Sequence, residues 1–375
     1  QRAAAIGLWG AVTGLGVAIG PILGGALLEI YWWGSLFLAL VPIALVAAVA
    51  APLVIPRSSP DTDSTLDRGG LALSVVMLGA LVYTIIEAPE HGWDSIHTLA
   101  GFAVALSAAV GFVRWERRQS DPLLDVTLFA NLRFSAASGA VTVAFFALFG
   151  FIFLIIQFMQ MLQGFSPLDT GVRILPVALS IAVGSLLGAR LAVTRVGTKA
   201  VVFIGLLMMA ASFAWISGID LSVGYPEMAA QMLLLGGGLG LTTAPATDSI
   251  MGVVRREQAG AGSAVNDATR QVGGTLGVAV LGSIFSTLYI RDLTDSQAFG
   301  ALPERARAVA QDGLAQGLSV AAQSPGEVAD VIRNTVSDAF LSGLHAGCLT
   351  AAAVCLAGAF FVLAFLPSHP IGDRS

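Results

Sequence analysis

Charged residues are scarce in this sequence. Asp, Glu, Lys and Arg make up 11% of the 375 residues, whereas hydrophobic residues make up 56%. A soluble domain carries about a quarter charged residues, so this chain has too few charges to cover a surface that faces water. The composition excludes an ordinary soluble protein and predicts an integral membrane protein.

Cysteine, basic charge and catalytic motifs are also rare or absent. Cys348 and Cys355 lie in one apolar run at a spacing that fits neither a CxxC redox pair nor a pair of zinc ligands. The net charge of -5 gives no basic surface for nucleic acid. The apolar runs contain no HExxH motif, Walker motif, cluster of metal ligands or nucleophile–base pair. We therefore expect no enzyme activity, no cofactor, no metal site and no nucleic-acid partner.

Long apolar runs, by contrast, are abundant. A helix that crosses a bilayer needs about 20 mostly apolar residues, and about ten runs meet this rule. They lie near residues 4–28, 34–55, 70–88, 97–115, 134–160, 171–192, 200–218, 228–253, 262–289 and 340–366. The predicted fold class is therefore an all-α, polytopic membrane protein.

Basic residues are unevenly distributed between the segments that connect these runs. Arg and Lys favour the cytoplasmic side of short loops. When Gln1 is placed inside and the sides alternate, Arg173 is the one exception on the outer side apart from the long segment of about 290–339. This distribution predicts that both ends of the chain are cytoplasmic. The long segment is then an external loop, which we expect to be partly helical and mobile.

Two polar linkers divide the apolar runs. The linkers "PRSSPDTDSTLDRGG" (56–70) and "RWERRQSDPLLDVTLFANLRF" (114–134) flank an isolated pair of runs, and six runs follow, the size of one helical bundle. The expected domains are residues 1–56, residues 57–117 with the linker and the helix pair, and residues 118–375 with the bundle and its external loop.

Glycines and a proline interrupt the first apolar run. In "GLWGAVTGLGVAIGPILGGALLE", Gly16, Gly20 and Gly24 recur every fourth residue, beside Pro21 and Gly25. In lipid, small residues four apart make a flat face on which another backbone can lie, and a proline inside a helix frees a carbonyl and bends the helix. Such a face suits a contact that slides or re-forms, and static close packing explains it equally well. The spacing does not fit a GxGxxG nucleotide-binding loop.

Several segments, taken in order, resemble one transporter family. "GVAIGPILGG" (16–25) resembles the antiporter motif GxxxGPxxGG of the major facilitator superfamily. "YWWGSLFLALVP", "EAPEHGW", "DPLLDVTLFANLRF", "QGFSPLDTGVRILP" and "GSAVNDATRQVGGTLGVAVLGS" resemble its drug:proton antiporters with fourteen spans. The resemblance extends from residue 2 to about residue 367. It implies a major facilitator fold with about ten of an expected fourteen helices, in a sequence that lacks the first four helices of the family, and with the extra helix pair between two six-helix bundles.

The resemblance also implies a function. It implies a proton-coupled antiporter of the plasma membrane, in which two bundles rock about a central cavity and export drug-like, amphipathic molecules. Its partners would be a small-molecule substrate, protons and the lipid bilayer, and it would act as a monomer. The opening glycine face would pack against the C-terminal bundle, for which "SIAVGSLLGAR", with Gly184 and Gly188, is the candidate partner. The alternatives are export of a metabolite, peptide or lipid precursor, and a membrane sensor that does not transport.

Ionisable residues inside apolar runs are the strongest functional signal in the sequence. Asp248 lies about 10 Å from the cytoplasmic interface, Asp267 lies at a similar depth on the next helix, and Arg270 lies one turn deeper. A lone carboxylate in a low dielectric resists ionisation and can exchange a proton, whereas one paired with Arg270 stays charged. Either acid could therefore couple to protons while the other pairs with Arg270. The alternative is a purely structural ion-pair network.

Amide side chains are candidates for a substrate cavity. Gln157, Gln160 and Gln163 follow one another every third residue among bulky apolar side chains, and Asn266 and Gln271 lie on the helix that carries Arg270. Such residues could line a cavity for amphipathic molecules. Ordinary helix contacts explain them equally well.

Basic residues in "GARLAVTRVGTK" (188–199) are candidates for an inner gate. The segment resembles the cytoplasmic loop between the second and third helices of a bundle. Arg190, Arg195 and Lys199 could bind the carbonyl groups at helix C-termini and close that gate. Plain anchoring on the cytoplasmic side is the alternative.

Three further polar or aromatic features receive structural interpretations. Trp32, Trp33 and Trp93 fall in predicted external loops, where tryptophan anchors a chain at the membrane interface. Glu87, at the end of the third run, is expected to have a structural or lipid-facing role. His345 is expected to be a packed or interfacial histidine.

Overall fold

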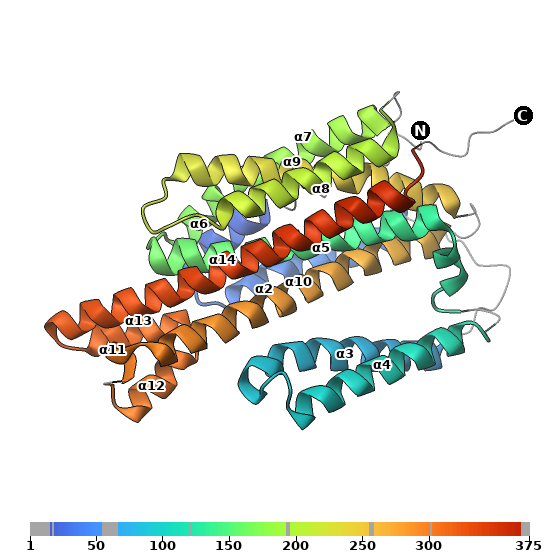
Figure 1. Cartoon of the computed structure of the whole chain (residues 1–375). Helices are drawn as coiled ribbons and strands as arrows, with labels where there is room; N and C mark the ends of the chain where they lie inside the picture. The colour runs from blue at the N-terminus through green and yellow to red at the C-terminus, as the bar shows by residue number, and fades with distance from the viewer. Residues whose placement is uncertain are drawn as a thin grey trace, which may run out of the picture.

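The computed structural model describes residues 16, 19–54, 67–119, 122–192, 196–254, 259–300 and 302–368. Within these residues every regular element is a helix, as the composition predicts. Eight of the described helices are long and apolar enough to cross a membrane. Figure 1 shows the longest of them running side by side.

The helices follow one another with short connections. After an apolar helix at Ile19–Ile30 they are, in chain order, α2 (Ser35–Val54), α3 (Arg68–His91), α4 (Ile96–Glu116), the 3-10 turn η1 (Val126–Ala130), α5 (Leu132–Gln157), the π-helical turn η2 (Phe158–Leu162), α6 (Pro167–Arg173), α7 (Leu175–Ala192), α8 (Gly197–Ile216), α9 (Tyr225–Val253), α10 (Ala259–Asp295), α11 (Gln297–Gly300), α12 (Glu304–Gln311), α13 (Leu314–Gln323) and α14 (Gly326–Phe365). Each of the ten predicted runs coincides with a helix, the first run over its described part only.

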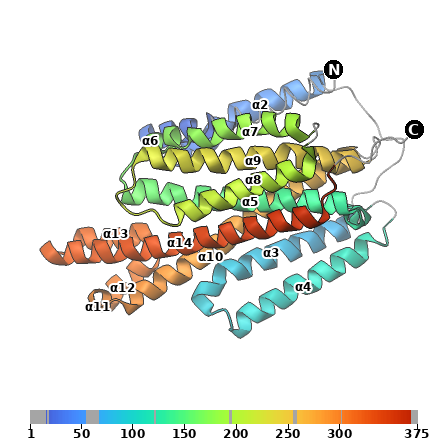
Figure 2. The ribbon, with the colours of Figure 1, turned by 45° about the horizontal axis from the view of Figure 1, so that its top comes forward.

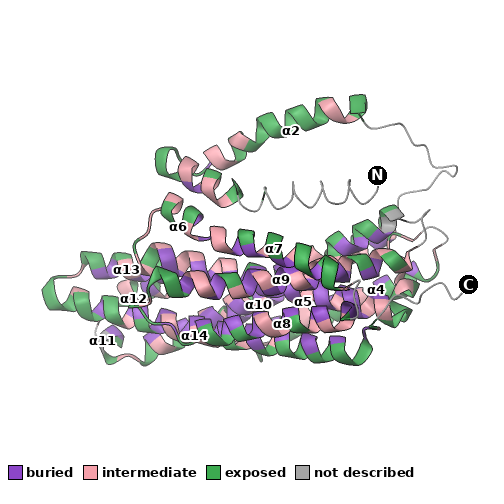
Figure 3. Ribbon diagram, turned by 90° about the horizontal axis from the view of Figure 1, so that it is seen from above, coloured by how far each residue is buried: buried purple, intermediate pink, exposed green. Residues whose placement is uncertain are grey.

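The helix α9 lies at the centre of the bundle. It packs against α5, α7 and α8, and Figure 3 shows buried residues concentrated along these helices. A Cβ atom on Gly236 would overlap the carbonyl oxygen of Val177, and one on Gly240 would overlap that of Ile181. Glycines that let neighbouring backbones approach so closely also dilute the apolar character of α9. α9, although a predicted span, is not among the eight helices counted above as long and apolar enough to cross a membrane.

Gly184 and Gly188 of α7 belong to the same contact. A Cβ atom on Gly184 would lie 2.5 Å from the carbonyl oxygen of Gly237, and one on Gly188 would lie 3.1 Å from the Cα of Leu241. Both glycines are buried against α9. The prediction that they receive the opening glycine helix is therefore wrong, because this face of α7 is already occupied.

The helix pair α3–α4 lies along one side of the bundle, with α3 against α10, as Figures 1 and 2 show. Asp67 caps α3 and joins it to α4, because its Oδ1 accepts hydrogen bonds from the Gly70 N–H and the Trp115 Nε1–H, both at 2.8 Å. The bonds from Gly70 and Trp115 lower the pKa of the Asp67 carboxyl group. At the end of α4, the buried Glu116 accepts a bond from the Leu124 N–H at 3.1 Å. The pair is thereby joined to the segment that leads into α5.

The helix α2, in contrast to α9, is not packed inside the bundle. None of its residues is buried, and Figure 3 shows it set apart from α9 and α10. Trp32 and Trp33, just before it, are exposed and pack edge to face with ring centroids 5.5 Å apart, a position that suits interfacial anchors. An apolar helix exposed on every side has to be covered by lipid or by another protein segment.

The predicted external loop is a packed helical structure. α10 continues to Asp295 and α14 begins at Gly326. At 1.5 Å per residue the two helices are about 55 Å and 60 Å long, nearly twice the thickness of the hydrocarbon core. The short helix α13 packs against α14 and α12, and α11 contacts both α10 and α14; Figure 2 shows all three beside the projecting ends of α10 and α14. We call α11–α13 and these two ends the cap. The expected helical content of this segment is confirmed, and its mobility and its external position stay predictions.

Tyr289 lies at the centre of the cap. Its ring stacks on that of Phe285 with centroids 5.8 Å apart, and its hydroxyl donates to the carbonyl oxygens of Ala310 and Gly313, each at 3.1 Å. A Cβ atom on Gly317 would lie 2.7 Å from this hydroxyl, so the bond requires glycine there. One tyrosine thus connects α10 to α12 and to the turn before α13.

Replacing Tyr289 by Phe is expected to loosen the cap. The change removes the hydroxyl from two buried carbonyl groups, and one lost hydrogen bond costs about 1 kcal/mol. Hydrogen exchange should become about fivefold faster in α12 and α13 and stay unchanged in α9. Tyr83→Phe is the control, because Tyr83 is 66% exposed. Equal exchange in the two variants would contradict the role of the Tyr289 hydroxyl.

Candidate functional site

The opening helix Ile19–Ile30 contacts the bundle through Pro21 and Gly25. A Cβ atom on Gly171 of α6 would overlap the carbonyl oxygen of Pro21. A Cβ atom on Gly25 would overlap the carbonyl oxygen of Pro167 and lie 2.7 Å from the Cα of Leu168. The two helices therefore meet backbone on backbone, with no side chain between them at these two points.

The three regularly spaced glycines are placed differently. Among the described residues, nothing lies within 4 Å of a Cβ position on Gly16 or Gly20, and the nearest neighbour of Gly24 is Leu36 at 3.6 Å. The face that meets α6 is instead the neighbouring one, which carries Pro21 and Gly25, also four residues apart. The expectation that Gly16 and Gly20 pack against a second helix bundle is therefore corrected within the described residues.

Arg173 fixes the position of α6. Its Nη1 lies 2.8 Å from Asp169 Oδ1, and its guanidinium carbon lies 4.1 Å from the centre of the Phe165 ring. Tyr225, the first residue of α9, adds a second ring at 5.7 Å. Arg173 is the basic residue that departs from the predicted inside–outside distribution. Its contacts give it a structural role, because they hold α6 next to the Pro21 contact. Sequence reasoning missed both of its aromatic partners, Phe165 and Tyr225.

A polar group lies where α5, α9 and α10 meet. Arg270 Nη2 donates to Thr247 Oγ1 at 3.2 Å, and its guanidinium carbon lies 5.2 Å from the centre of the Phe145 ring. Thr247 in turn donates to Asn266 Oδ1 at 3.3 Å. Asn266 is buried between the helices, so its side chain belongs to the packing of α9 against α10. Thr247 and Phe145 are members of this group that sequence reasoning missed.

Glycines on α10 allow this group to form. Cβ atoms on Gly273 and Gly277 would overlap the carbonyl oxygens of Thr142 and Phe146 on α5. The face of α10 that carries Asn266, the two glycines and Arg270 therefore packs against α5 and α9, as expected from helical spacing.

The candidate acids lie beside this polar group. Asp248 follows Thr247 on α9, and Asp267 follows Asn266 on α10. Both acids are exposed, and so is Gln271 one turn further along α10. Arg270 is thus half-buried among three helices, whereas two carboxyl groups on neighbouring helices are exposed. The choice between them as the proton-coupled group stays a prediction.

The three glutamines near the end of α5 do not share one α-helical face. The π-helical turn η2 lies between Gln157 and Gln163 and contains Gln160, and a π turn changes the angle between successive residues. Gln157 Nε2 donates to the Phe153 carbonyl and Gln163 Nε2 to the Val223 carbonyl, both at 3.1 Å. Helix and loop contacts therefore account for the amide nitrogens of Gln157 and Gln163, whereas Gln163 Oε1 is buried without a hydrogen-bond partner.

The loop between α7 and α8 carries the candidate inner-gate residues. Arg190 is exposed in the last turn of α7, Lys199 is half-buried in the first turn of α8, and Arg195 lies outside the described residues. The Thr198 N–H donates to the carbonyl oxygen of Ser368 at 2.9 Å. The first turn of α8 is thus joined to the segment that follows α14.

Comparison with known proteins assigns the family. Residues 1–278 match the Major Facilitator Superfamily. The chain belongs to this superfamily. Major facilitator proteins are transporters rather than enzymes, and the predicted family, the helical fold and the multi-pass membrane location are confirmed.

The similar major facilitator proteins include drug-resistance proteins of bacteria. Multidrug resistance protein Stp of Mycobacterium tuberculosis (strain CDC 1551 / Oshkosh) is 33% identical over 76% of this chain and 53% of its own length. The tetracenomycin C resistance and export protein of Streptomyces glaucescens is 30% identical over 98% of this chain and 69% of its own length. The multidrug efflux pump LfrA of Mycolicibacterium smegmatis (strain ATCC 700084 / mc(2)155) is 32% identical over 96% and 71%. The chain thus spans about half the length of Stp and about seven tenths of the other two.

A solved structure is also similar to this major facilitator chain. It is a bacterial homologue of the human lysosomal transporter Spinster in an inward-facing, unoccupied conformation. The TM-score is 0.47 at 16% sequence identity, over 80% of this chain and 69% of that chain.

Proposed function

We propose that this chain is part of a proton-coupled efflux transporter of the plasma membrane, which exports drug-like or other amphipathic small molecules by alternating access. The relatives above are named for drug resistance and export. Residues 1–56 and 118–375 would belong to the two halves that move, with the α3–α4 pair beside the second half.

The contact of Pro21 and Gly25 with α6 carries this proposal. An alternating transporter needs a seal that holds tightly and separates at low cost. Backbone surfaces without side chains meet this need for two reasons. They bury little apolar area, and no side chains have to change rotamer when the two surfaces separate. The contact at Gly171 has this character.

The exposed carboxyl groups of Asp248 and Asp267 supply the proposed proton coupling. Each acid follows, in the sequence, a member of the polar group that contains Arg270: Asp248 follows Thr247, and Asp267 follows Asn266. When a substrate or a conformational change alters the distance between acid and guanidinium, the carboxylate takes up or releases a proton. Gln271, also exposed, lies on the same surface of α10 and is the nearest candidate for polar contact with a substrate.

Everted vesicles that contain the full-length protein test this function. Addition of ethidium or methyl viologen should release protons from energised wild-type vesicles, and Asp267→Asn or Asp248→Asn should reduce this release at least about tenfold. Asp295→Asn, an exposed acid at the far end of α10, is the control and should behave like wild type. Substrate binding without proton movement in the wild type would favour the sensor instead. Normal proton release in the double Asp→Asn variant would exclude both acids from coupling.

A further inference from the structure

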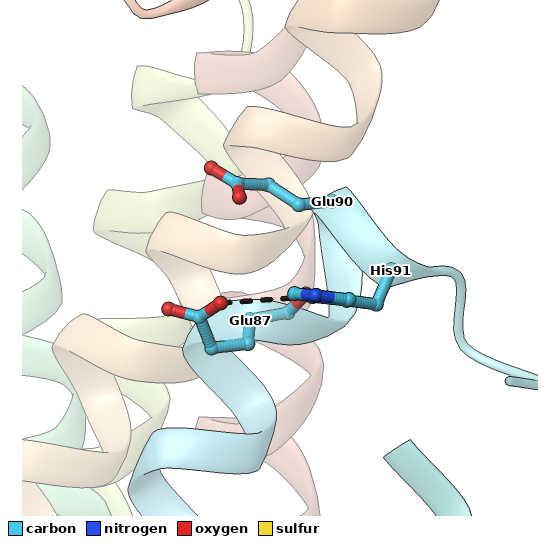
Figure 4. Close-up of side chains that lie close together, drawn as sticks. All are labelled: Glu87, Glu90 and His91. Carbon is cyan, nitrogen blue, oxygen red and sulfur yellow. Dashed lines mark hydrogen bonds and ion pairs between the residues drawn. The ribbon is translucent and has the colours of Figure 1, made fainter. Parts of the chain in front are cut away.

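Three side chains that can bind metal meet at the end of α3, and a fourth lies across the turn at the start of α4. Donor atoms of Glu87, Glu90 and His91 lie within 4.8 Å of one another, and Figure 4 shows the three side chains at the end of α3. His91 Nδ1 lies 3.6 Å from Glu87 Oε2. His97 adds a second imidazole from the start of α4, with its ring centroid 5.8 Å from that of His91.

The spacing of the two imidazoles fits ligation of one ion. A zinc–nitrogen bond is about 2.0–2.1 Å long, so two imidazoles on one tetrahedral ion have ring centres about 5–6 Å apart. The observed 5.8 Å between His91 and His97 lies in this range. Surface carboxylates alone attract cations of many kinds, whereas imidazole nitrogen favours Zn²⁺ and similar transition ions over Mg²⁺ and Ca²⁺.

The turn that carries these side chains is fixed. Gly92 ends α3 with a φ of 90°, a conformation that favours glycine. Thr98 Oγ1 donates to the Gly92 carbonyl at 2.8 Å, and Ser95 Oγ caps α4 by accepting from the Thr98 N–H at 3.2 Å. The ends of the two helices are therefore held in register before any ion binds. A ligand set held in place in this way loses little conformational entropy on binding.

The four side chains are also open to water. The side chains of His91 and Glu87 are 47% and 35% exposed, and Glu90 and His97 are exposed as well. An ion can reach them without any movement of the helices. Their replacement leaves the packing of α3 against α4 intact, because the buried contacts of this hairpin end are made by Thr84, Ala88 and Thr98.

We propose that Glu87, Glu90, His91 and His97 bind one Zn²⁺ ion. The ion would receive two imidazole nitrogens and two carboxylate oxygens, a four-coordinate set of the kind that zinc accepts. It would join the end of α3 to the start of α4. This site is separate from the polar group around Arg270 and does not depend on transport.

Titration of the purified full-length protein with Zn²⁺ alone tests the site. Relative to wild type, His91→Ala/His97→Ala is expected to lose one bound Zn²⁺ per chain, with at least about a 100-fold loss of affinity at that site, and Glu90→Gln about a tenfold loss. X-ray absorption of the zinc-loaded wild type should show two imidazole nitrogens at about 2.0–2.1 Å. The control is His345→Asn, because the His345 ring contacts the Ile219 carbonyl far from this turn. It should bind Zn²⁺ like wild type.

Two results would overturn the site. One is an unchanged zinc stoichiometry and affinity in the His91→Ala/His97→Ala variant. The other is displacement of Zn²⁺ by an equal concentration of Mg²⁺, which would mean that the carboxylates act without the imidazoles.

Discussion

Leucine in place of Gly171 is expected to abolish substrate efflux by the full-length protein. The new Cβ atom would overlap the carbonyl oxygen of Pro21, and two backbones cannot rotate away from each other as side chains can. The opening helix would have to move by about 1 Å or more to restore van der Waals distances. If this contact is the seal of an alternating transporter, the separation leaves the passage open to leakage. Ethidium efflux from cells should fall at least about tenfold, at a protein level within about twofold of wild type.

Gly16→Leu and Gly20→Leu are matched controls on the opening helix itself. No described residue lies within 4 Å of a Cβ atom on either glycine, so efflux by these variants should stay within about twofold of wild type. Gly25→Leu should resemble Gly171→Leu, because its Cβ atom would overlap the Pro167 carbonyl oxygen from the other side of the same contact. Loss of efflux in Gly16→Leu with normal efflux in Gly171→Leu would assign the seal to the regularly spaced glycines and contradict the α6 contact.

Leucine in place of Gly277 is expected to cause the largest loss of stability. A Cβ atom there would overlap the Phe146 carbonyl oxygen and lie 2.9 Å from the Phe146 Cα. Overpacking costs about 1–3 kcal/mol, and a clash with backbone lies at the upper end of this range. Arg270 of α10 lies over the Phe145 ring of α5, so separation of these two helices would disturb the polar group as well. The midpoint of thermal unfolding in detergent should fall by about 4 °C.

Gly79→Leu is the control for this second prediction. Gly79 also lies inside a long helix, α3, but nothing lies within 4 Å of its Cβ position. Leucine favours a helix over glycine by nearly 1 kcal/mol, so this variant should unfold at the wild-type temperature or slightly above it. Equal loss of stability in Gly79→Leu and Gly277→Leu would mean that added bulk in any helix, rather than the α5–α10 contact, causes the effect.

The helices were predictable from the sequence, whereas the contacts between them were not. A run of about 20 apolar residues forms a helix in a membrane because its backbone groups can bond only to one another, and this rule is local. Contacts between helices do not follow from such a local rule. The spacing of Gly184 and Gly188 predicts a flat helix face, but it does not predict which helix packs on that face. The structure places α9 there.

The cap and the candidate site show the same limit. In the cap, the apolar residues between 290 and 339 are too scattered in the sequence to suggest a core. They form one because α10, α11, α12, α13 and α14 converge there, and the Tyr289 hydroxyl bonds to the carbonyl groups of Ala310 and Gly313. On α10, helical spacing correctly placed Asn266 and Arg270 on one face. Their partners Thr247 and Phe145 come from other helices, and one sequence contains no signal for such pairs.

The length of α10 and α14 has a consequence for measurement. Both helices continue without a break from the bundle into the cap, so the cap turns with the bundle as the far end of a rigid lever. For a given angle, a point at its tip travels farther than any point within the bilayer. A spectroscopic label at Ser324, beside the outer end of α14, would therefore report a tilt of the bundle as a magnified change in distance.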